Sequence, residues 1–407
     1  MTERFPCIDG LRAIAAFAVL VTHVSFVTTA NRVVGGSYFA RLDSGVAIFF
    51  VISGFLLYRP FVAAALRGDT IGGIRAYFWR RGLRIFPAYW AAALTMVLVF
   101  SAKPWAGVGD ALMHLGLVHI YDPDTVVSGP ISQAWSLGTE ISFYVVLPLL
   151  AVVASAIGRR TDRRIGPQLA FVGVLIVASL IYRWQVYEHA GANAATMATW
   201  LPGYLDQFGL GMLLAVVSAA SAQQAAEGGS VWPAWTAFTA NAWFPFVSWM
   251  LAFASLSAAA FVIDLPTSSL DYSVGEVVGR QVTYGLWGLF LVLPAAFGPQ
   301  RDRGGAVRWF LRTRVARSLG LVSYGVYLWH QFFIDRFQRV TGTPEFSGRF
   351  GETLLFVVVG ATAAATISYV VVEKPVLRLK DLGPGRTASP IPVGPSGTGS
   401  AVPASRT

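Results

Sequence analysis

The sequence predicts an all-α polytopic membrane protein with about ten transmembrane helices and both termini in the cytoplasm. Of its 407 residues, 55% are hydrophobic and only 13% are charged, whereas soluble domains carry about 25% charged residues. Apolar runs of about 17 to 25 residues recur along the chain, and each can cross a hydrocarbon layer of roughly 30 Å. The runs are continuous and lack the alternation of β-barrel strands, so they indicate helices.

Ten segments have the length and polarity expected of a transmembrane helix. They cover residues 8–29, 44–66, 86–102, 134–157, 168–187, 203–221, 242–263, 277–298, 318–337 and 352–373. We expect residues 1–381 to form one transmembrane domain without internal repeats. Residues 382–407 are rich in Gly, Pro, Ser and Thr, which is typical of a disordered tail, here a cytoplasmic one.

Residues 108–120 form a further apolar stretch that decides the topology. The stretch is short and polar for a crossing, and basic residues gather in four places, within 67–84, 159–164, 301–317 and 374–380. All four places face the cytoplasm, as the positive-inside rule expects, only if residues 108–120 do not cross. We therefore predict that this stretch lies along the outer surface or re-enters the membrane.

The net charge of +10 does not indicate a nucleic-acid-binding protein, because the arginines lie in short loops and form no aromatic-interleaved groove. Membrane topology and anionic lipid headgroups account for them. Cys7 is the only cysteine, which excludes an intrachain disulfide and a paired-cysteine metal site. We expect no metal and no bound cofactor, and we expect the first apolar segment to be retained rather than cleaved.

Arg12 and His23 lie on one face of the first predicted helix. They are eleven residues apart, which places them within roughly 20° of each other and about 16 Å apart along the axis. Glu140, in the fourth predicted helix, lies about 9 Å below the outer end of its helix, as His23 does in its own. A carboxylate and an imidazole at one depth indicate a base and its orienting partner, although each could instead be a hydrogen-bond partner between helices.

A basic cluster, Arg80, Arg81 and Arg84, stands at the cytoplasmic end of the third predicted helix. Arg80 and Arg84 are four residues apart and share a helix face. Three guanidiniums beside an apolar entrance suit a multiply phosphorylated ligand. Plain anchoring to the membrane surface explains the cluster equally well.

Other polar residues within the predicted helices are weaker candidates. Ser53 and Gly54 allow close approach of helices, or a narrow passage. Tyr324 and His330 lie in the motif SYGVYLWHQ, where aromatic residues usually belong to the interfacial belt. Arg183 and Asp206 lie near outer helix ends, where they either meet a polar acceptor or reach toward the interface.

Taken together, these stretches resemble the integral-membrane acyltransferase-3 family, bacterial O-acyltransferases that modify O-antigen, cell-wall glycans and some glycosylated metabolites. The resemblance covers about residues 5–380 and rests on IDGLRAIAAFAVLVTH, FFVISGFLL, RRGLRIFPAYW, AWSLGTEISFYVVLPLL, SYGVYLWHQ and VVEKP. It implies acyl-CoA as donor, with essential Arg12 and His23. It also assigns the Trp-Ser-Leu-x-x-Glu motif to Trp135, Ser136, Leu137 and Glu140.

The resemblance predicts transfer of a short acyl group from cytoplasmic acyl-CoA to a hydroxyl of a cell-envelope glycan or glycolipid at the bacterial inner membrane. We expect His23, Glu140 and Arg12 to be catalytic, and Arg80, Arg81, Arg84 and Ser53 to bind the donor. Trp135, Ser136, Tyr324, His330, Arg183 and Asp206 are candidates for the acceptor side. Many family members add an extracytoplasmic hydrolase-like domain, and we expect no such relay here.

Two alternatives stay open. The acceptor could be a glycosylated or macrolide-type metabolite rather than an envelope glycan. A secondary transporter or flippase also has many helices and a few intramembrane charges, but it should show symmetric halves with broken helices, which the sequence does not indicate.

Overall fold

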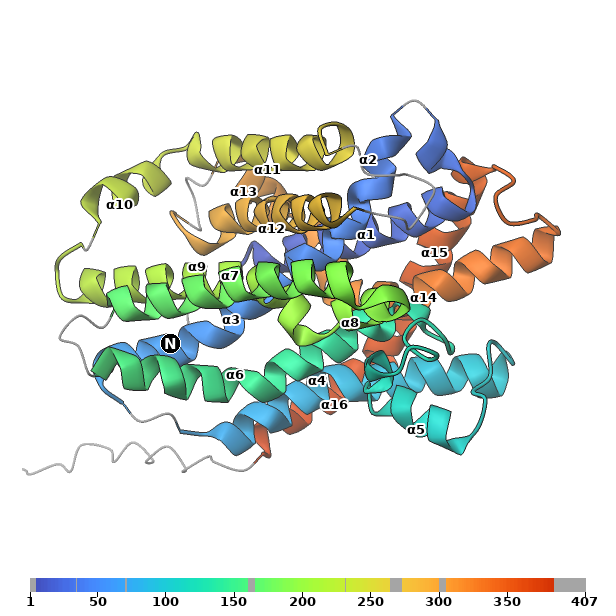
Figure 1. Cartoon of the computed structure of the whole chain (residues 1–407), viewed down its shortest axis with the longest axis horizontal. Coiled ribbons are helices and arrows are strands. Elements are labelled where there is room, and N and C mark those ends of the chain that lie inside the picture. Colours follow the sequence, from blue (N-terminus) through green and yellow to red (C-terminus); the bar gives the residue numbers. More distant parts are fainter. Residues whose placement is uncertain are drawn as a thin grey trace, which may run out of the picture.

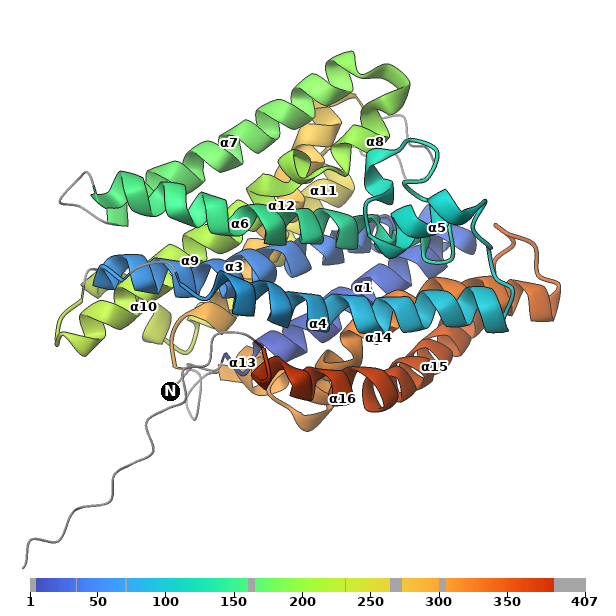
Figure 2. The ribbon, with the colours of Figure 1, turned by 90° about the horizontal axis from the view of Figure 1, so that it is seen from below.

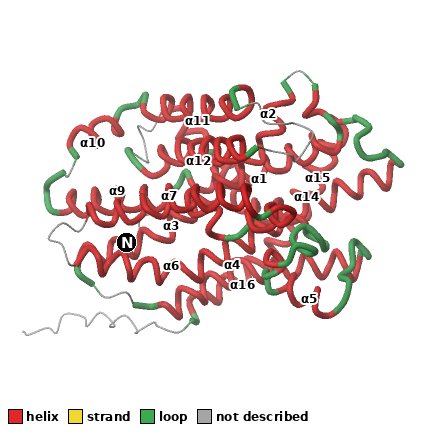
Figure 3. Tube along the Cα trace, in the orientation of Figure 1, coloured by secondary structure: helices red, strands yellow, loops and turns green. Residues whose placement is uncertain are grey.

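The computed structural model describes residues 5–33, 35–69, 72–159, 165–230, 232–263, 273–299 and 305–383. These residues form helices and loops and contain no strand (Figure 3). The predicted tail from residue 384 onward lies outside the described residues, as do residues 160–164 and 301–304 of two predicted basic clusters.

Most of the long helices of the described part run along the long axis of the molecule (Figures 1 and 2). They are α1 (Ile8–Val27), α3 (Gly45–Arg67), α4 (Ile74–Leu94), α6 (Trp135–Arg159), α7 (Ile165–His189), α9 (Leu205–Ala226), α11 (Phe244–Phe261), α12 (Val274–Ala296), α14 (Arg314–Thr341) and α15 (Phe350–Ser368). The shorter helices are α2 (Gly36–Arg41), α5 (Val108–Leu115), α8 (Ala194–Ala198), α10 (Pro233–Ala240), α13 (Gly305–Leu311) and α16 (Lys374–Leu377).

Eight segments of the described chain are long and apolar enough to cross a membrane. Two further long helices, α12 and α14, coincide with predicted spans 277–298 and 318–337 but do not meet the same criteria of hydropathy and charge. The prediction of an all-α polytopic membrane protein is confirmed. The number of crossings and the side of each terminus stay predictions.

The third predicted span was placed too late in the chain. Helix α4 begins at Ile74 and continues through the arginines to Leu94, whereas hydropathy alone placed its start near residue 86. Arginines lower the mean hydropathy of a window, yet they do not end a helix, because Arg is a good helix former. The basic cluster therefore lies within a helix and is displayed with helical periodicity.

Helices α3 and α9 pack with their backbones in close contact. A Cβ atom added to Gly54 would lie 2.1 Å from the carbonyl oxygen of Phe208, and one added to Gly211 would lie 2.1 Å from that of Val51. Only glycine allows this separation, as is common where membrane helices cross. The expectation that Gly54 permits close helix approach is confirmed.

Helix α1 occupies the interior of the bundle and packs against α3 and α14. Gly320 of α14 allows the second contact, because a Cβ there would lie 2.0 Å from the backbone oxygen of Asp9. This position brings Arg12 and His23 among other helices. Two ionisable groups on α1 can therefore line internal cavities.

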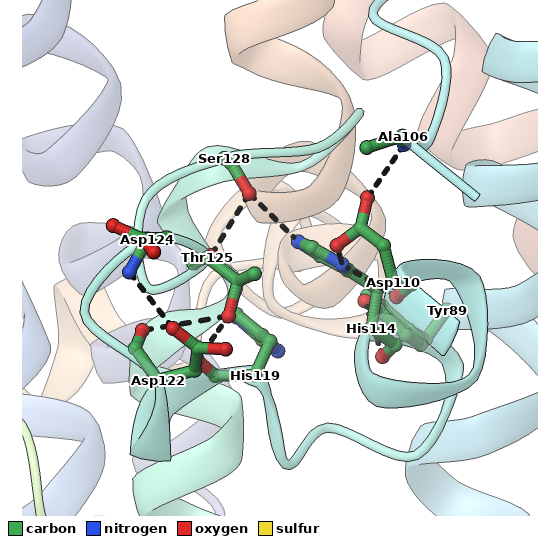
Figure 4. Close-up of polar contacts among 9 residues, drawn as sticks. All are labelled: Tyr89, Ala106, Asp110, His114, His119, Asp122, Asp124, Thr125 and Ser128. Atoms are coloured by element: carbon green, nitrogen blue, oxygen red, sulfur yellow. Dashed lines mark hydrogen bonds and ion pairs between the residues drawn. The ribbon is translucent and has the colours of Figure 1, made fainter. Parts of the chain in front are cut away.

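Residues 106–131 form a compact segment outside the long helices, which we call the cap segment (Figure 4). Its helix α5 has eight residues, about 12 Å in length, which is too short to cross a membrane. The Tyr89 hydroxyl of α4 donates a hydrogen bond of 2.9 Å to the carbonyl of His114 and ties the cap segment to the bundle. The prediction that residues 108–120 do not cross as a helix agrees with this structure.

Two histidines stack inside the cap segment. The rings of His114 and His119 are nearly parallel, with centroids 4.6 Å apart. His119 is fully buried, and neither of its ring nitrogens has a hydrogen-bond partner among the described residues. Burial, aided by the neighbouring His114, lowers the pKa of His119 to about 4.

Candidate active site

Two cavities in the helix bundle contain the residues that the sequence analysis predicts to be catalytic. The first has a volume of about 90 Å³ and is lined by residues of α1, α3, α4, α6 and α14, including Arg12, Arg81 and Arg84. We call it the arginine cavity. The second has a volume of about 380 Å³ and is lined by His23 and by polar residues of α7, α9 and α12. We call it the histidine cavity.

The arginine cavity carries a net positive charge. Its guanidinium groups come from Arg12, Arg81 and Arg84, against one carboxylate, Glu140. The Nε atom of Arg81 is buried and has no hydrogen-bond partner among the described residues. A buried, unsatisfied cationic donor is costly unless a ligand satisfies it, and so the cavity suits an anion.

Arg80 does not belong to this cavity, contrary to the prediction that all three arginines of the cluster bind one ligand. Its side chain is exposed, whereas Arg81 and Arg84 are partly buried and line the cavity. The spacing of four between Arg80 and Arg84 does not decide which arginines line the cavity, because the spacing of three between Arg81 and Arg84 also keeps two side chains on one face. The packing of α4 turns the face with Arg81 and Arg84 toward the cavity.

Glu140 also lines the arginine cavity. Its Oε1 atom accepts hydrogen bonds from the Ser53 hydroxyl, at 2.5 Å, and from the Tyr144 hydroxyl, at 2.7 Å. Ser53 lines the cavity too, as expected of a donor-side residue. One carboxylate thus links α3 to α6 at the edge of the positively charged space.

Several polar side chains line the histidine cavity. Asp43 accepts a hydrogen bond of 2.7 Å from Arg280 and one of 2.5 Å from the Tyr284 hydroxyl. The side-chain oxygens of Gln133 and Gln207 are buried and have no partner among the described residues, and both residues line the cavity. The cavity therefore offers unused acceptors to a ligand that carries hydroxyl groups.

One wall of the histidine cavity is aromatic. Trp135 and Tyr204 stack with ring centroids 5.6 Å apart, and the Arg183 guanidinium lies 4.7 Å from the centroid of Tyr204. Arg183 is buried and donates to the carbonyl of Gly203 at 2.7 Å. Arg183 thus does not reach toward the membrane interface; it fixes the loop that carries part of the wall.

His23 contacts His330, not Glu140. Its Nδ1 atom lies 3.0 Å from Nε2 of His330 and 3.0 Å from the carbonyl oxygen of Val19. Glu140 makes its hydrogen bonds to Ser53 and Tyr144 and has none to His23 among the described residues. The predicted contact between His23 and Glu140 is therefore absent. Counting depth from helix ends assumed that those ends are level, whereas short helical turns precede α6 and follow α1.

Tyr327 and Val46 belong to both cavities, since both residues line each of them. The Tyr327 hydroxyl donates to the carbonyl of Gln133 at 2.8 Å and is 2.7 Å from the Ser136 hydroxyl. The two cavities thus adjoin at the side chains of Tyr327 and Val46.

The remaining acceptor-side candidates do not share one place. Trp135 and Arg183 line the histidine cavity, whereas Ser136 and Tyr324 line the arginine cavity. Asp206 lines neither; it is buried and accepts from Ser179 and Gln281. His330 is buried behind His23.

Four residues that line these cavities were not predicted as site residues from the sequence: Asp43, Tyr144, Arg280 and Tyr327. Asp43 directly precedes the second predicted span, so a carboxylate at a helix end was the available signal. No spacing in the sequence pairs it with Arg280, 237 residues later.

The comparisons with known proteins decide the family. The model of the acyltransferase-3 family, described as an acyltransferase domain, matches residues 5–373. The chain belongs to this family. The resemblance given by the sequence motifs is therefore confirmed.

Three relatives of this chain show how its length compares. YrhL of Bacillus subtilis (strain 168), whose name proposes peptidoglycan O-acetyltransferase activity, is 24% identical over 91% of this chain and 54% of its own length. Nodulation protein 10 of Rhizobium leguminosarum bv. viciae is 26% identical over 91% of this chain and 93% of its own. Acyltransferase MdmB of Streptomyces mycarofaciens is 30% identical over 53% and 57%. The chain thus spans about half of YrhL, and no solved structure matches it.

Proposed function

We propose that the protein transfers a short acyl group, such as acetyl or succinyl, from acyl-CoA to a hydroxyl of a cell-envelope glycan or glycolipid. The observation that carries this proposal is that a cationic cavity and a cavity containing His23 adjoin at Tyr327 and Val46. An anionic donor and a neutral hydroxylated acceptor can thus approach one point from two directions. The name of YrhL, which concerns O-acetylation of peptidoglycan, supports the class of acceptor.

The donor side is assigned to the arginine cavity. CoA carries several phosphate groups, and Arg81 and Arg84 can each form forked hydrogen bonds to phosphate oxygens. The pantetheine arm is uncharged and suits the apolar residues between these arginines and Tyr327. Glu140 accepts hydrogen bonds from the Ser53 and Tyr144 hydroxyls in this cavity. We therefore assign Glu140 to the donor side of the reaction.

The acceptor side is assigned to the histidine cavity. Its unpaired oxygens on Gln133 and Gln207 can accept hydrogen bonds from sugar hydroxyls, and Trp135 offers an aromatic face beside them. The pair of Asp43 and Arg280 adds a charged acceptor and donor. The sugar of a glycosylated metabolite would use the same groups, so that acceptor class is the second candidate.

The chemistry assigned to His23 is general base catalysis. Its Nε2 atom takes the proton of the acceptor hydroxyl as the oxygen attacks the thioester carbonyl carbon. The C–S bond then breaks, the new ester bond stays with the acceptor, and the proton passes from His23 to the sulfur of the departing CoA. Atoms and charge balance without a metal or a redox step.

The test is consumption of a thioester by the purified protein in lipid nanodiscs. Radiolabelled acetyl-CoA and fragments of envelope glycan are supplied, and both free CoA and labelled glycan are measured. We expect CoA release that depends on the glycan and equals the label transferred. Unchanged acetyl-CoA under these conditions would contradict the proposal, and movement of intact substrate across a proteoliposome membrane would instead support a transporter or flippase.

A further inference from the structure

The contact between His23 and His330 shows which ring nitrogens of the two histidines carry a proton. His330 is fully buried, and its Nδ1 atom lies 2.8 Å from the carbonyl oxygen of Tyr327 and 3.3 Å from that of Val326. A carbonyl oxygen only accepts hydrogen bonds, so Nδ1 of His330 must carry the proton. In a neutral ring, the Nε2 atom of His330 is then an acceptor.

The same reasoning applies to His23. Its Nδ1 atom lies 3.0 Å from the Val19 carbonyl oxygen, which again only accepts. The other neighbour of that nitrogen is Nε2 of His330, the acceptor just identified, at 3.0 Å. Both neighbours therefore require a proton on Nδ1 of His23, which the two acceptors share. This leaves the Nε2 lone pair of His23 unprotonated.

The opposite arrangement is unfavourable. If His330 donated from Nε2, the Nδ1 atom of His23 would have to present a lone pair to His330, and that lone pair would also face the Val19 oxygen at 3.0 Å. His330 would then carry a positive charge in a fully buried position, without an ion pair among the described residues. Two independent contacts thus select one tautomer.

The position of His330 is itself fixed by a neighbour. The side-chain amide of Gln133 donates to the carbonyl oxygen of Tyr327 at 2.8 Å, the same oxygen that receives the proton of His330. Gln133 precedes α6, whereas His330 is in α14. The ring orientation of His330 is therefore coupled to contact between two elements of the bundle.

We propose that His330 is a positioning residue that holds His23 in the Nδ1-protonated tautomer, with Nε2 directed to the acceptor hydroxyl. This inference rests on the proposed function, and it replaces the role that sequence reasoning assigned to Glu140. When His23 takes the acceptor proton on Nε2, its Nδ1–H becomes a charge-assisted donor to His330. His330 thereby stabilises the imidazolium as well as the starting tautomer, as the third group of a nucleophile–base–orienter arrangement does.

Two substitutions of His330 distinguish a role in positioning His23 from a role in packing alone. In His330→Asn, the side-chain nitrogen stands close to the place of Nδ1 and keeps the donor to Tyr327, but the acceptor toward His23 is lost. In His330→Gln, the side-chain oxygen stands close to the place of Nε2 and keeps that acceptor. We expect His330→Asn to lower kcat by about 10²-fold, as for other losses of catalytic geometry, with KM for donor and acceptor nearly unchanged. We expect His330→Gln to recover most of the lost rate.

His189→Asn is the matched control, because His189 is exposed at the end of α7 and should leave kcat unchanged. Equal loss in the Asn and Gln variants would show that His330 only packs against its neighbours and would overturn the proposal. Wild-type kcat in His330→Asn would also overturn it.

A second measurement does not depend on activity. The chain contains five histidines, so ¹⁵N-histidine NMR of the protein in nanodiscs, assigned with single variants, can report the tautomer of His23. We expect the Nδ1–H form in the wild type and a mixture of both forms in His330→Asn. The Nε2–H form in the wild type would overturn the inference. If the wild type consumes no thioester but shows the Nδ1–H form, the proposed function fails while the hydrogen-bonding inference stands.

Discussion

At the scale of single residues, the proposed chemistry depends on a base that has a free nitrogen. His23 lies in a polar cavity, its Nδ1 atom is held by two neighbours, and Nε2 has no hydrogen-bond partner among the described residues. Ionisable groups inside membrane helices are costly and usually serve function. The residue that matters most to the proposed reaction is therefore His23.

The first prediction concerns that base. His23→Ala should lower the rate of acyl transfer by about 10² to 10⁴-fold, which is the usual contribution of general base catalysis. The measurement is the glycan-dependent release of CoA from acetyl-CoA, with His189→Ala as a surface control. A purified and folded His23→Ala variant with wild-type transfer would exclude His23 as the base.

A second prediction concerns His119, which lies outside the membrane-spanning helices. Burial lowers the pKa of His119 to about 4 in the folded cap segment, whereas the pKa is about 6.5 when the segment is open. Between these two pH values the open segment binds a proton that the folded segment does not. The stability that neutral His119 contributes is present above pH 6.5 and declines as the pH falls toward 4, by at most about 3 kcal/mol.

The measurement is hydrogen exchange of residues 106–131 at pH 7 and at pH 4.5, after correction for the intrinsic exchange rate. We expect opening of the cap segment to become more frequent at the lower pH. In His119→Phe this change should be much smaller, because an apolar ring leaves no unpaired nitrogen to protonate. The same pH dependence in both proteins would assign it to other groups.

At the scale of elements, helix α4 decides which arginines face a ligand. Arg81→Ala combined with Arg84→Ala should weaken binding of CoA, whereas Arg80→Ala should not, because Arg80 is exposed on another face. The losses should appear mainly in the KM for acyl-CoA, since the arginines contact phosphates that do not react.

Calorimetric titration of CoA into each protein in nanodiscs checks this prediction. Both variants remove positive charge from the same helix, so Arg80→Ala controls for the general attraction of anions to a basic surface. Similar weakening per arginine at all three positions would show that the cluster acts only by long-range charge.

The crossing of α3 and α9 yields a prediction on stability. Gly54→Ala should destabilise the protein by about 1 to 3 kcal/mol, because its Cβ would overlap the Phe208 carbonyl oxygen and the helices must separate. Thermal unfolding in detergent measures the effect. Gly173→Ala in α7 is the control, since a Cβ there meets nothing within 4 Å, and it should be neutral or slightly stabilising.

At the scale of the whole molecule, two cavities adjoin inside the bundle, and in the proposed reaction each receives a different substrate. The donor is expected to enter the arginine cavity and the acceptor the histidine cavity, so the two substrates need not be on the same side of the membrane. In inverted bacterial membrane vesicles, acetyl-CoA added outside should therefore acetylate glycan enclosed in the lumen. Transfer only to acceptors on the side of acetyl-CoA would contradict this arrangement.

The sequence by itself determined the membrane class, the positions of most helices and the family, because hydropathy and motif order are local properties of the chain. It also placed Arg12 and His23 on one face of α1, since helical periodicity relates residues of a single helix. Only the tertiary structure decided that His330 is the partner of His23, that Glu140 belongs with Ser53 and Tyr144, and that Arg80 faces away. These relations depend on the rotation, tilt and stagger of different helices, which are set by packing contacts such as that of Gly54 with Phe208 and leave no spacing signal along the chain.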